Sequence, residues 1–285
     1  MAAAAVGAES AVGELLGRAY PSRDAPTPRY RSWDGGRGGG QGRRTAVASL
    51  AAYPRPVSRT DGEVSHRGQG DDDPYAAARA RMVETQLRAR GIRDPRVLAA
   101  MASVPREAFV PVGLRDLAYA DEALPIEHGQ TISQPLMVGL MTELLAPEPG
   151  DRVLDVGTGT GYQAAVLAAM GCRVTSVERL PALAATARER LAALGFADRV
   201  EVRVGDGSAG EPTDAPWPRI IVAAAAPSVP DSLTSQLADG GRLVIPVGPR
   251  YEQELVLVER EGDRLRTTRH GACVFVPLVG EGGFP

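Results

Sequence analysis

The sequence predicts an α/β fold, in which a doubly wound and mostly parallel sheet carries helices between its strands. In the second half of the chain, apolar runs of strand length alternate with segments of helix length, a pattern typical of such a sheet. Three of these runs, 152–156, 219–223 and 243–247, are nearly continuously apolar, as expected of central parallel strands. A glycine-rich turn also joins the first run to a helix, and ligands of this fold bind outside the carboxyl ends of its strands.

The turn after strand 152–156 carries Gly157, Gly159 and Gly161, and a helix over 162–170 is expected to follow at once. Glycine lets the backbone approach a ligand closely, and the start of a helix presents unpaired N–H groups. The dinucleotide fingerprint G-x-G-x-x-G needs a small residue where this chain has Tyr162. The ligand is therefore expected to be something other than a dinucleotide.

An acidic residue indicates a nucleoside-bearing cofactor. The next strand is expected at 173–177, and Glu178 stands at its carboxyl end, where a carboxylate can accept hydrogen bonds from both hydroxyls of a ribose. Residues 155–161 read D-x-G-x-G-x-G and resemble motif I of class I methyltransferases that use S-adenosylmethionine. The alternative interpretation is an ordinary strand-to-helix turn without a ligand.

Three helices are expected before this turn. Asp73-Pro74 predicts the start of a helix over 75–90 that ends at Gly91, and Asp94-Pro95 predicts the start of a second helix over 96–102. A loop over 121–130 and a third helix over 136–145 are expected to follow.

Further strands and helices are expected after the glycine turn. The expected helices cover 181–194 and part of 231–238, and the expected strands cover 201–204, 219–223, 242–247, 255–259 and 273–276. Asp206 and Gly207 follow the third strand of the sheet, at the edge where a ligand would lie. The alternative for Asp206 is a turn residue between two glycines.

Composition limits the other classes of function. The formal net charge of −3 gives no general case for binding nucleic acid or a membrane, and no apolar run approaches the ~20 residues that a membrane helix needs. The two cysteines, Cys172 and Cys273, form neither a disulfide framework nor a metal pattern, so we expect a reduced, cytoplasmic protein without a metal.

The first 72 residues are rich in Ala, Gly, Arg, Ser and Pro, which predicts a low-complexity, disordered extension apart from a possible short helix near 11–20. Residues 35–44 read GGRGGGQGRR, and arginine–glycine segments can bind nucleic acid non-specifically. A nucleic-acid-binding role of this tail therefore stays open as an alternative function.

Several further motifs resemble one family, the protein-L-isoaspartate (D-aspartate) O-methyltransferases. The resemblance covers roughly residues 75–280. Its most specific segment is Gly-Gln-Thr-Ile-Ser-Gln-Pro at 129–135, and the other segments are 82–92, 104–111, 155–163, 204–207, 223–227 and 236–248. It implies a methyltransferase domain over 73–285, with an N-terminal helical and active-site segment at 73–150 and a cofactor-binding α/β core at 151–285.

The resemblance implies methyl transfer from S-adenosyl-L-methionine to the α-carboxylate of L-isoaspartyl residues in damaged proteins and peptides. The ester closes to a succinimide, which hydrolyses to normal aspartate or to isoaspartate, and S-adenosyl-L-homocysteine is the second product. The resemblance also implies site residues: Ser133 at the catalytic centre, and cofactor contacts from Thr131, Ile132, Ser133, Gln134, Gly157, Gly159, Glu178, Asp206 and Gly207.

The chemistry suits these residue types. A carboxylate has an ordinary pKa near ~4, so at neutral pH it is already an ionised nucleophile and needs no general base. It reacts with a sulfonium cation, and the attraction between the two is strong in a site of low dielectric. We therefore expect the Ser133 hydroxyl to orient the substrate carboxylate; the alternative is that Ser133 only caps the helix after Pro135.

Other polar residues are expected to be structural. His128 lies in a loop and Cys172 follows Gly171, so neither is expected to act in catalysis, and Asp155 is expected to orient the glycine turn. The chain departs from the family at Pro218, where members often carry aspartate, and at 275–279, which lacks a threonine of some relatives. The second of these leaves a cofactor or substrate contact open, whereas Pro218 is expected to affect local geometry.

The expected partners are isoaspartyl proteins and peptides, with no nucleic acid and no membrane, and the expected state is a monomer. A related enzyme that forms succinimide in one biosynthetic peptide is the alternative within the same fold.

Overall fold

The computed structural model describes residues 73–285, and all structural statements below concern these residues. The expectations for residues 1–72, including the helix near 11–20 and the Arg/Gly segment, lie outside them.

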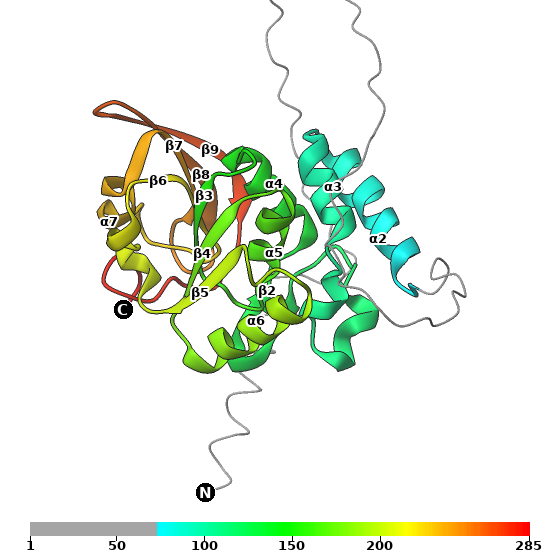
Figure 1. Cartoon of the computed structure of the whole chain (residues 1–285). Coiled ribbons are helices and arrows are strands. Elements are labelled where there is room, and N and C mark those ends of the chain that lie inside the picture. The colour runs from blue at the N-terminus through cyan, green and yellow to red at the C-terminus, as the bar shows by residue number, and fades with distance from the viewer. Residues whose placement is uncertain (1–72) are drawn as a thin grey trace, which may run out of the picture. The chain divides into compact units, whose positions relative to one another are not determined.

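The core is a seven-stranded sheet in the order β5-β4-β3-β6-β7-β8-β9. Its strands are β3 (Arg152–Val156), β4 (Arg173–Glu178), β5 (Val200–Val204), β6 (Trp217–Val222), β7 (Leu237–Val247), β8 (Gln253–Glu261) and β9 (Arg264–Cys273). The first five strands are parallel to their neighbours, and β8 and β9 join as an antiparallel edge (Figure 1). The predicted doubly wound, mostly parallel sheet is therefore confirmed.

The strand order reverses between β3 and β6. From β3 the chain proceeds outward through β4 to β5, and it then returns to place β6 on the other side of β3. In open α/β sheets such a reversal leaves a crevice at the carboxyl ends of the two strands, because their following connections turn to opposite faces. The glycine turn after β3 lies at this point.

Two apolar clusters cover the two faces of the sheet. One cluster joins Val153, Val174 and Val244 to α3 (Pro95–Ser103), α4 (Pro135–Leu145), α5 (Tyr162–Ala169) and α6 (Pro181–Ala193). The other joins Leu154, Val156 and Val222 to Leu233 of the short α7 (Asp231–Ser235). Figure 1 shows α4, α5 and α6 on one side of the sheet and α7 on the other. None of the helices in residues 73–285 has the length and apolar composition needed to cross a bilayer.

The first helical segment is less regular than the sequence predicts. It begins as α2 (Ala76–Met82), passes through a π-helical turn at Val83–Leu87 and ends as a 3₁₀ turn at Arg88–Arg90. The predicted cap at Asp73 is wrong, because the N-cap is Tyr75 and no side chain caps it. The predicted end is confirmed, since Gly91 takes a left-handed conformation with φ 104°.

The second helix, α3, has the start that the sequence predicts. Asp94 is its N-cap and accepts a hydrogen bond from the Arg96 amide at 2.8 Å. Residues 121–130, expected as a loop, contain a 3₁₀ turn at Glu127–Gly129 and the short strand β1 (Leu124–Pro125). Because β1 pairs with β2 (Thr131–Ile132), the segment that leads into α4 has a defined backbone.

The predicted strand at 273–276 is wrong. The last strand is β9, which ends at Cys273, and residues 274–276 belong to no strand. Most residues of β9 are exposed, and they are rich in arginine and threonine. An edge strand of this kind lacks the apolar run that identifies a buried strand, so its sequence pattern is weak.

Pro218 affects local geometry, as expected. It lies in β6, and the pairing between β6 and β7 shifts register between Trp217 and Arg219. Proline cannot donate to the ladder of a sheet, so an irregularity at this position is the ordinary outcome.

Candidate active site

A pocket lies at the reversal of strand order, at the carboxyl ends of β3, β4 and β6. It contains about 950 Å³ of empty space, part of which is open to solvent. Its wall includes seven of the residues expected in the site: Thr131, Ile132, Ser133, Gly157, Gly159, Glu178 and Gly207. The structure thus brings together segments that lie more than 70 residues apart in the chain.

The glycine turn has the backbone conformation that its sequence indicates. Gly157, Gly159 and Gly161 all have positive φ, at 91°, 54° and 92°. A Cβ atom on Gly161 would also lie 3.1 Å from the side chain of Leu191 in α6. Glycine is therefore required here both by the backbone and by helix packing.

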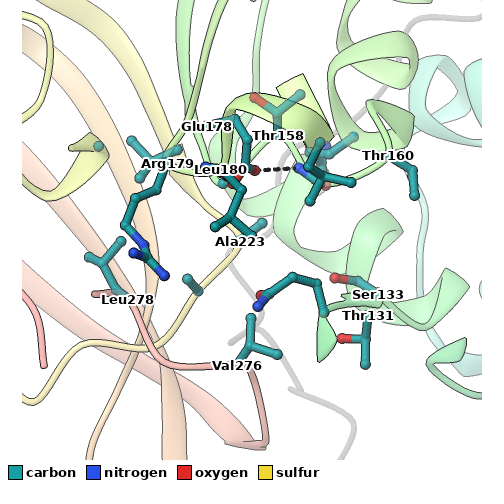
Figure 2. Close-up of a pocket in the computed structure, with 18 of the residues that line it drawn as sticks. Thr131, Ser133, Thr158, Thr160, Glu178, Arg179, Leu180, Ala223, Val276 and Leu278 are labelled. Atoms are coloured by element: carbon teal, nitrogen blue, oxygen red, sulfur yellow. Dashed lines mark hydrogen bonds between the residues drawn. The ribbon is translucent and has the colours of Figure 1, made fainter. Parts of the chain in front are cut away.

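Glu178 holds the turn against the next strand. One carboxylate oxygen accepts a hydrogen bond from the Gly159 amide at 2.9 Å, which Figure 2 shows as a dashed line, and the other accepts from the Leu180 amide at 3.0 Å. The side chain is almost fully buried but lines the pocket. Since an ionised carboxylate has about four acceptor positions, two remain for ligand hydroxyls.

A buried row of hydrogen-bonded side chains supports the glycine turn on the side away from the pocket. The Ser176 hydroxyl donates to Asp155 Oδ2 at 2.7 Å and lies 2.6 Å from the hydroxyl of Thr158, a residue of the turn. The pKa of Asp155 is raised from 3.8 to about 7, mainly by burial; the bond from Ser176 opposes this rise, and the negative charge of Glu178 contributes to it. This arrangement agrees with the expectation that Asp155 orients the turn.

Ser133 lies on the wall opposite Leu278 and Arg179 in the view of Figure 2. The alternative that Ser133 caps the following helix is wrong, because the N-cap of α4 is Gln134 and no side-chain hydrogen bond caps this helix. Its backbone carbonyl accepts a hydrogen bond from Arg106 Nη2 at 2.7 Å. Within the described residues its hydroxyl has no hydrogen-bond partner and remains available to a ligand.

Two expected site residues are absent from the wall of this pocket. The Gln134 side chain turns to Asp121, donating to its backbone oxygen at 2.9 Å and to Oδ1 at 2.7 Å. The Asp206 carboxylate accepts from the Ser208 amide at 2.9 Å, the Ser208 hydroxyl at 2.6 Å and the Glu281 amide at 2.9 Å. Asp206 thus begins a 3₁₀ turn and also holds the C-terminal segment, so the turn interpretation is confirmed. The contact that Asp206 is expected to make with the cofactor stays a prediction.

Other pocket residues were not among the expected site residues. Val276, Pro277, Leu278 and Val279 form part of the wall, and Figure 2 shows Val276 and Leu278 there. The sequence had left a cofactor or substrate contact at 275–279 open, and the structure places four residues of this segment in the wall. Ala223 and Ala224 also line the pocket, and their place at the carboxyl end of β6 could have indicated this.

The polar residues expected to be structural lie away from the pocket wall. His128 is exposed and has a left-handed backbone conformation, with φ 59°. Cys172 is fully buried, and burial raises the pKa of its thiol to about 12, so it packs as a small apolar group. No group of three or more His, Cys, Asp or Glu side chains in residues 73–285 is arranged to hold a metal ion.

The pocket fits S-adenosylmethionine in its chemistry. Glu178 offers acceptors for a ribose, the glycine turn offers close backbone approach, and Val156, Val177 and Leu183 offer apolar surface for a base. At Gly207 a Cβ atom would lie 2.5 Å from Val156, so a side chain there would disturb this wall. The doubly wound sheet, the glycine turn and the acid after the next strand define a class I S-adenosylmethionine-dependent methyltransferase.

Within this class, the chain belongs to the protein-L-isoaspartate (D-aspartate) O-methyltransferase family, whose family model matches residues 78–283. It is a protein repair methyltransferase that uses S-adenosylmethionine, as its sequence motifs predict.

Individual relatives agree with this assignment. The chain is 56% identical over 211 residues to the protein-L-isoaspartate O-methyltransferase of Methanoregula boonei, covering 74% of this chain and 97% of the relative. It is 58% identical over 204 residues to that of Methylorubrum populi, covering 71% and 95%. A solved Plasmodium falciparum structure, described as such an enzyme in complex with S-adenosyl-L-homocysteine, is 26% identical with a TM-score of 0.61, covering 70% of this chain and 98% of that one.

Proposed function

We propose that this chain methylates the α-carboxylate of L-isoaspartyl residues with Ser133 as the residue that orients the substrate. The single observation that carries this role is the position of Ser133. It lies on the pocket wall, it does not cap α4, and its hydroxyl has no protein partner within residues 73–285. A free hydroxyl beside a cofactor pocket can donate to a carboxylate, and a hydrogen bond to a charged group is stronger than one between neutral groups.

The cofactor-binding roles belong to the same proposal. We assign Gly157 and Gly159 to the amino-acid end of the cofactor, Glu178 to its ribose and Gly207 to its base. Thr131 and Ile132 form the wall beside Ser133, while Gln134 supports that wall through Asp121. When bound, S-adenosylmethionine supplies a methyl group on a sulfonium. This methyl group is an electrophile that an already ionised carboxylate can attack.

The protein residues orient the substrate carboxylate, and they exclude water from the site. Ile132 is buried, and Val138 and Leu183 add apolar surface to the same pocket. In such surroundings the attraction between a carboxylate and a cation is weakly screened. The Ser133 hydroxyl can then hold one carboxylate oxygen while the other faces the methyl group.

We also propose that the methyltransferase domain spans 73–285, that the chain acts as a cytoplasmic monomer, and that neither nucleic acid nor a membrane is its partner. Both cysteines are free, as is usual in a reducing compartment. The net charge of −3 supports a protein substrate over a nucleic acid.

Substitution of Ser133 tests the central role. Ser133→Ala should lower kcat for an isoaspartyl peptide about 10- to 100-fold, the worth of one hydrogen bond to a charged group. The affinity for S-adenosyl-L-homocysteine, measured by calorimetry, should stay nearly unchanged. Ser103→Ala is the matched control, because the Ser103 hydroxyl bonds only to the backbone of its own helix, at Ala100. Unchanged turnover of the Ser133 variant would remove Ser133 from the reacting centre.

A further inference from the structure

We propose that Arg106 is a positioning residue, which sets the orientation of Ser133 from behind the pocket wall. This inference rests on the role proposed for Ser133 above. Arg106 begins a 3₁₀ turn at Arg106–Phe109, its side chain is fully buried, and it does not line the pocket. It therefore acts on the site only through the residues that it contacts.

One guanidinium joins three separate segments. Nη2 donates to the carbonyl of Ser133 at 2.7 Å, and Nε donates to the carbonyl of Ala118 at 2.7 Å. The guanidinium also lies over the ring of Tyr162, 4.9 Å from its centroid, at the first residue of α5. Ser133 and Tyr162 both line the pocket, so Arg106 fixes two parts of the wall relative to each other.

The bond to the Ser133 carbonyl bears directly on the Ser133 hydroxyl. The carbonyl carbon is bonded to the Cα atom that carries the side chain, so a donor that holds this carbonyl restricts the backbone position from which the hydroxyl projects. The planar guanidinium fork donates in fixed directions and can therefore hold two carbonyls in one arrangement. A displacement of about 1 Å in a reacting geometry can lower a rate about 100-fold.

Stability alone does not explain a charge at this position. Burial lowers the pKa of Arg106, which shows that the surroundings disfavour its charged form. Within the described residues Nη1 is buried without a hydrogen-bond partner. Replacing Arg106 by an apolar side chain would remove the buried charge and the unpaired donor, but it would also leave the carbonyls of Ser133 and Ala118 without this donor, at a cost of about 1–3 kcal/mol each.

The test is a pair of substitutions in the full-length chain, Arg106→Met and Arg106→Lys. For Arg106→Met we expect a folded chain whose unfolding temperature is lowered by the loss of two hydrogen bonds, an affinity for S-adenosyl-L-homocysteine within about 3-fold of the parent, and a kcat for an isoaspartyl peptide reduced about 10- to 100-fold. Tyr162 retains its edge contact with Phe109, which supports the cofactor wall in this variant. Arg106→Lys should restore part of kcat, because an ammonium can donate to one of the two carbonyls.

Arg188→Met is the matched control. Arg188 also donates through Nε and Nη2 to a backbone carbonyl, that of Val202, at 2.9 and 2.7 Å, but it lies away from the pocket. Its kcat should equal that of the parent chain.

A double-mutant cycle with Ser133→Ala separates this inference from the role of Ser133 itself. If Arg106 acts through Ser133, Arg106→Met should cause little further loss of kcat in the Ser133→Ala background. Equal losses in both backgrounds would overturn the role of Arg106 and leave that of Ser133 intact. Full activity of Ser133→Ala would instead overturn the proposed function.

Two other results would overturn the inference. One is full kcat in Arg106→Met. The other is a loss of affinity for S-adenosyl-L-homocysteine in Arg106→Met that is as large as the loss of kcat, since this would mark a general loosening of the pocket and not a misplaced Ser133 hydroxyl. If Arg106→Met does not fold, the same cycle with Arg106→Lys decides, because equal losses in both backgrounds again contradict the inference.

Discussion

Asp155 is a fully buried carboxyl at the end of β3, directly before the glycine turn. Its Oδ2 receives the Ser176 hydroxyl, whereas its Oδ1 has no partner among the described residues. Burial is the main reason that its pKa rises to about 7. The glycine turn is therefore supported by a group whose pKa lies near neutral pH.

The raised pKa of Asp155 predicts how stability depends on pH. Between pH 3.8 and about 7 the folded chain keeps a proton on Asp155 that the unfolded chain releases, so the free energy of unfolding falls as pH rises through this window. Asp155→Asn cannot titrate. As pH rises from 3.8 to about 7, the parent loses stability that the variant does not lose. The free energy of unfolding of Asp155→Asn minus that of the parent should therefore rise by up to about 4 kcal/mol, because each tenfold difference in proton affinity corresponds to ~1.4 kcal/mol.

Urea unfolding of both proteins from pH 4 to pH 8 measures this difference. Asp263→Asn, a change at an exposed position in the turn between β8 and β9, is the control. Parallel pH profiles of the parent and Asp155→Asn would contradict the account of Asp155.

At the scale of single residues, seven of the nine residues expected in the site lie in the pocket wall. Gly157, Gly159 and Glu178 follow strands whose apolar runs are clear, and the segment 131–133 is marked by its motif. The side-chain directions of Gln134 and Asp206 could not be predicted, because each depends on a partner distant in sequence, Asp121 or Glu281. The role of Arg106 could not be predicted for the same reason, because it depends on a contact with Ser133, 27 residues away.

At the scale of elements, the C-terminal segment is tied to the cofactor pocket. Residues 276–279 line the pocket, and the next residues return to the turn after β5, where Glu281 donates to Asp206 and the Gly282 amide donates to the Ser208 hydroxyl at 2.9 Å. A Cβ atom on Gly280 would collide with the Asp206 carboxylate. Asp206 therefore holds the segment that closes one side of the pocket.

Asp206→Asn should loosen this segment. An amide offers one oxygen where the carboxylate offers two, so either the Ser208 or the Glu281 contact loses its acceptor, at a cost of about 1–3 kcal/mol. We expect faster hydrogen exchange over residues 276–285 in the absence of cofactor, and weaker binding of S-adenosyl-L-homocysteine. Asp198→Asn, in an exposed loop away from the pocket, is the control.

The same experiment separates the two roles of Asp206. Weaker cofactor binding with unchanged hydrogen exchange would support the predicted contact of Asp206 with the cofactor, and it would contradict the inference that Asp206 holds the C-terminal segment.

The elements themselves were predictable where burial imposes a pattern. The parallel strands β3, β6 and β7 are apolar because both of their faces are covered, and α3 begins at a capping Asp94 followed by proline. The π-helical turn at Val83–Leu87 and the edge strand β9 were missed. Both depend on contacts with neighbouring elements and leave little periodicity in the sequence.

At the scale of the whole molecule, different parts of the fold form the two sides of the pocket. The sheet and its glycine turn form one part of the pocket, to which we assign the cofactor, while β2 and the start of α4 bring Ser133 to the opposite wall. Arg106 and Tyr162 connect this wall to the first turn of α5. Family membership over residues 78–283 agrees with this division, because it covers both parts.

The central claim is that this pocket serves methyl transfer to isoaspartyl residues. The most direct measurement uses the purified full-length chain, labelled S-adenosylmethionine and two peptides that differ only in carrying Asp or L-isoAsp at one position. We expect base-labile methyl incorporation into the isoaspartyl peptide alone, and a strong reduction in the Ser133→Ala variant. Cofactor binding without transfer to the isoaspartyl peptide, or equal transfer to both peptides, would contradict the account.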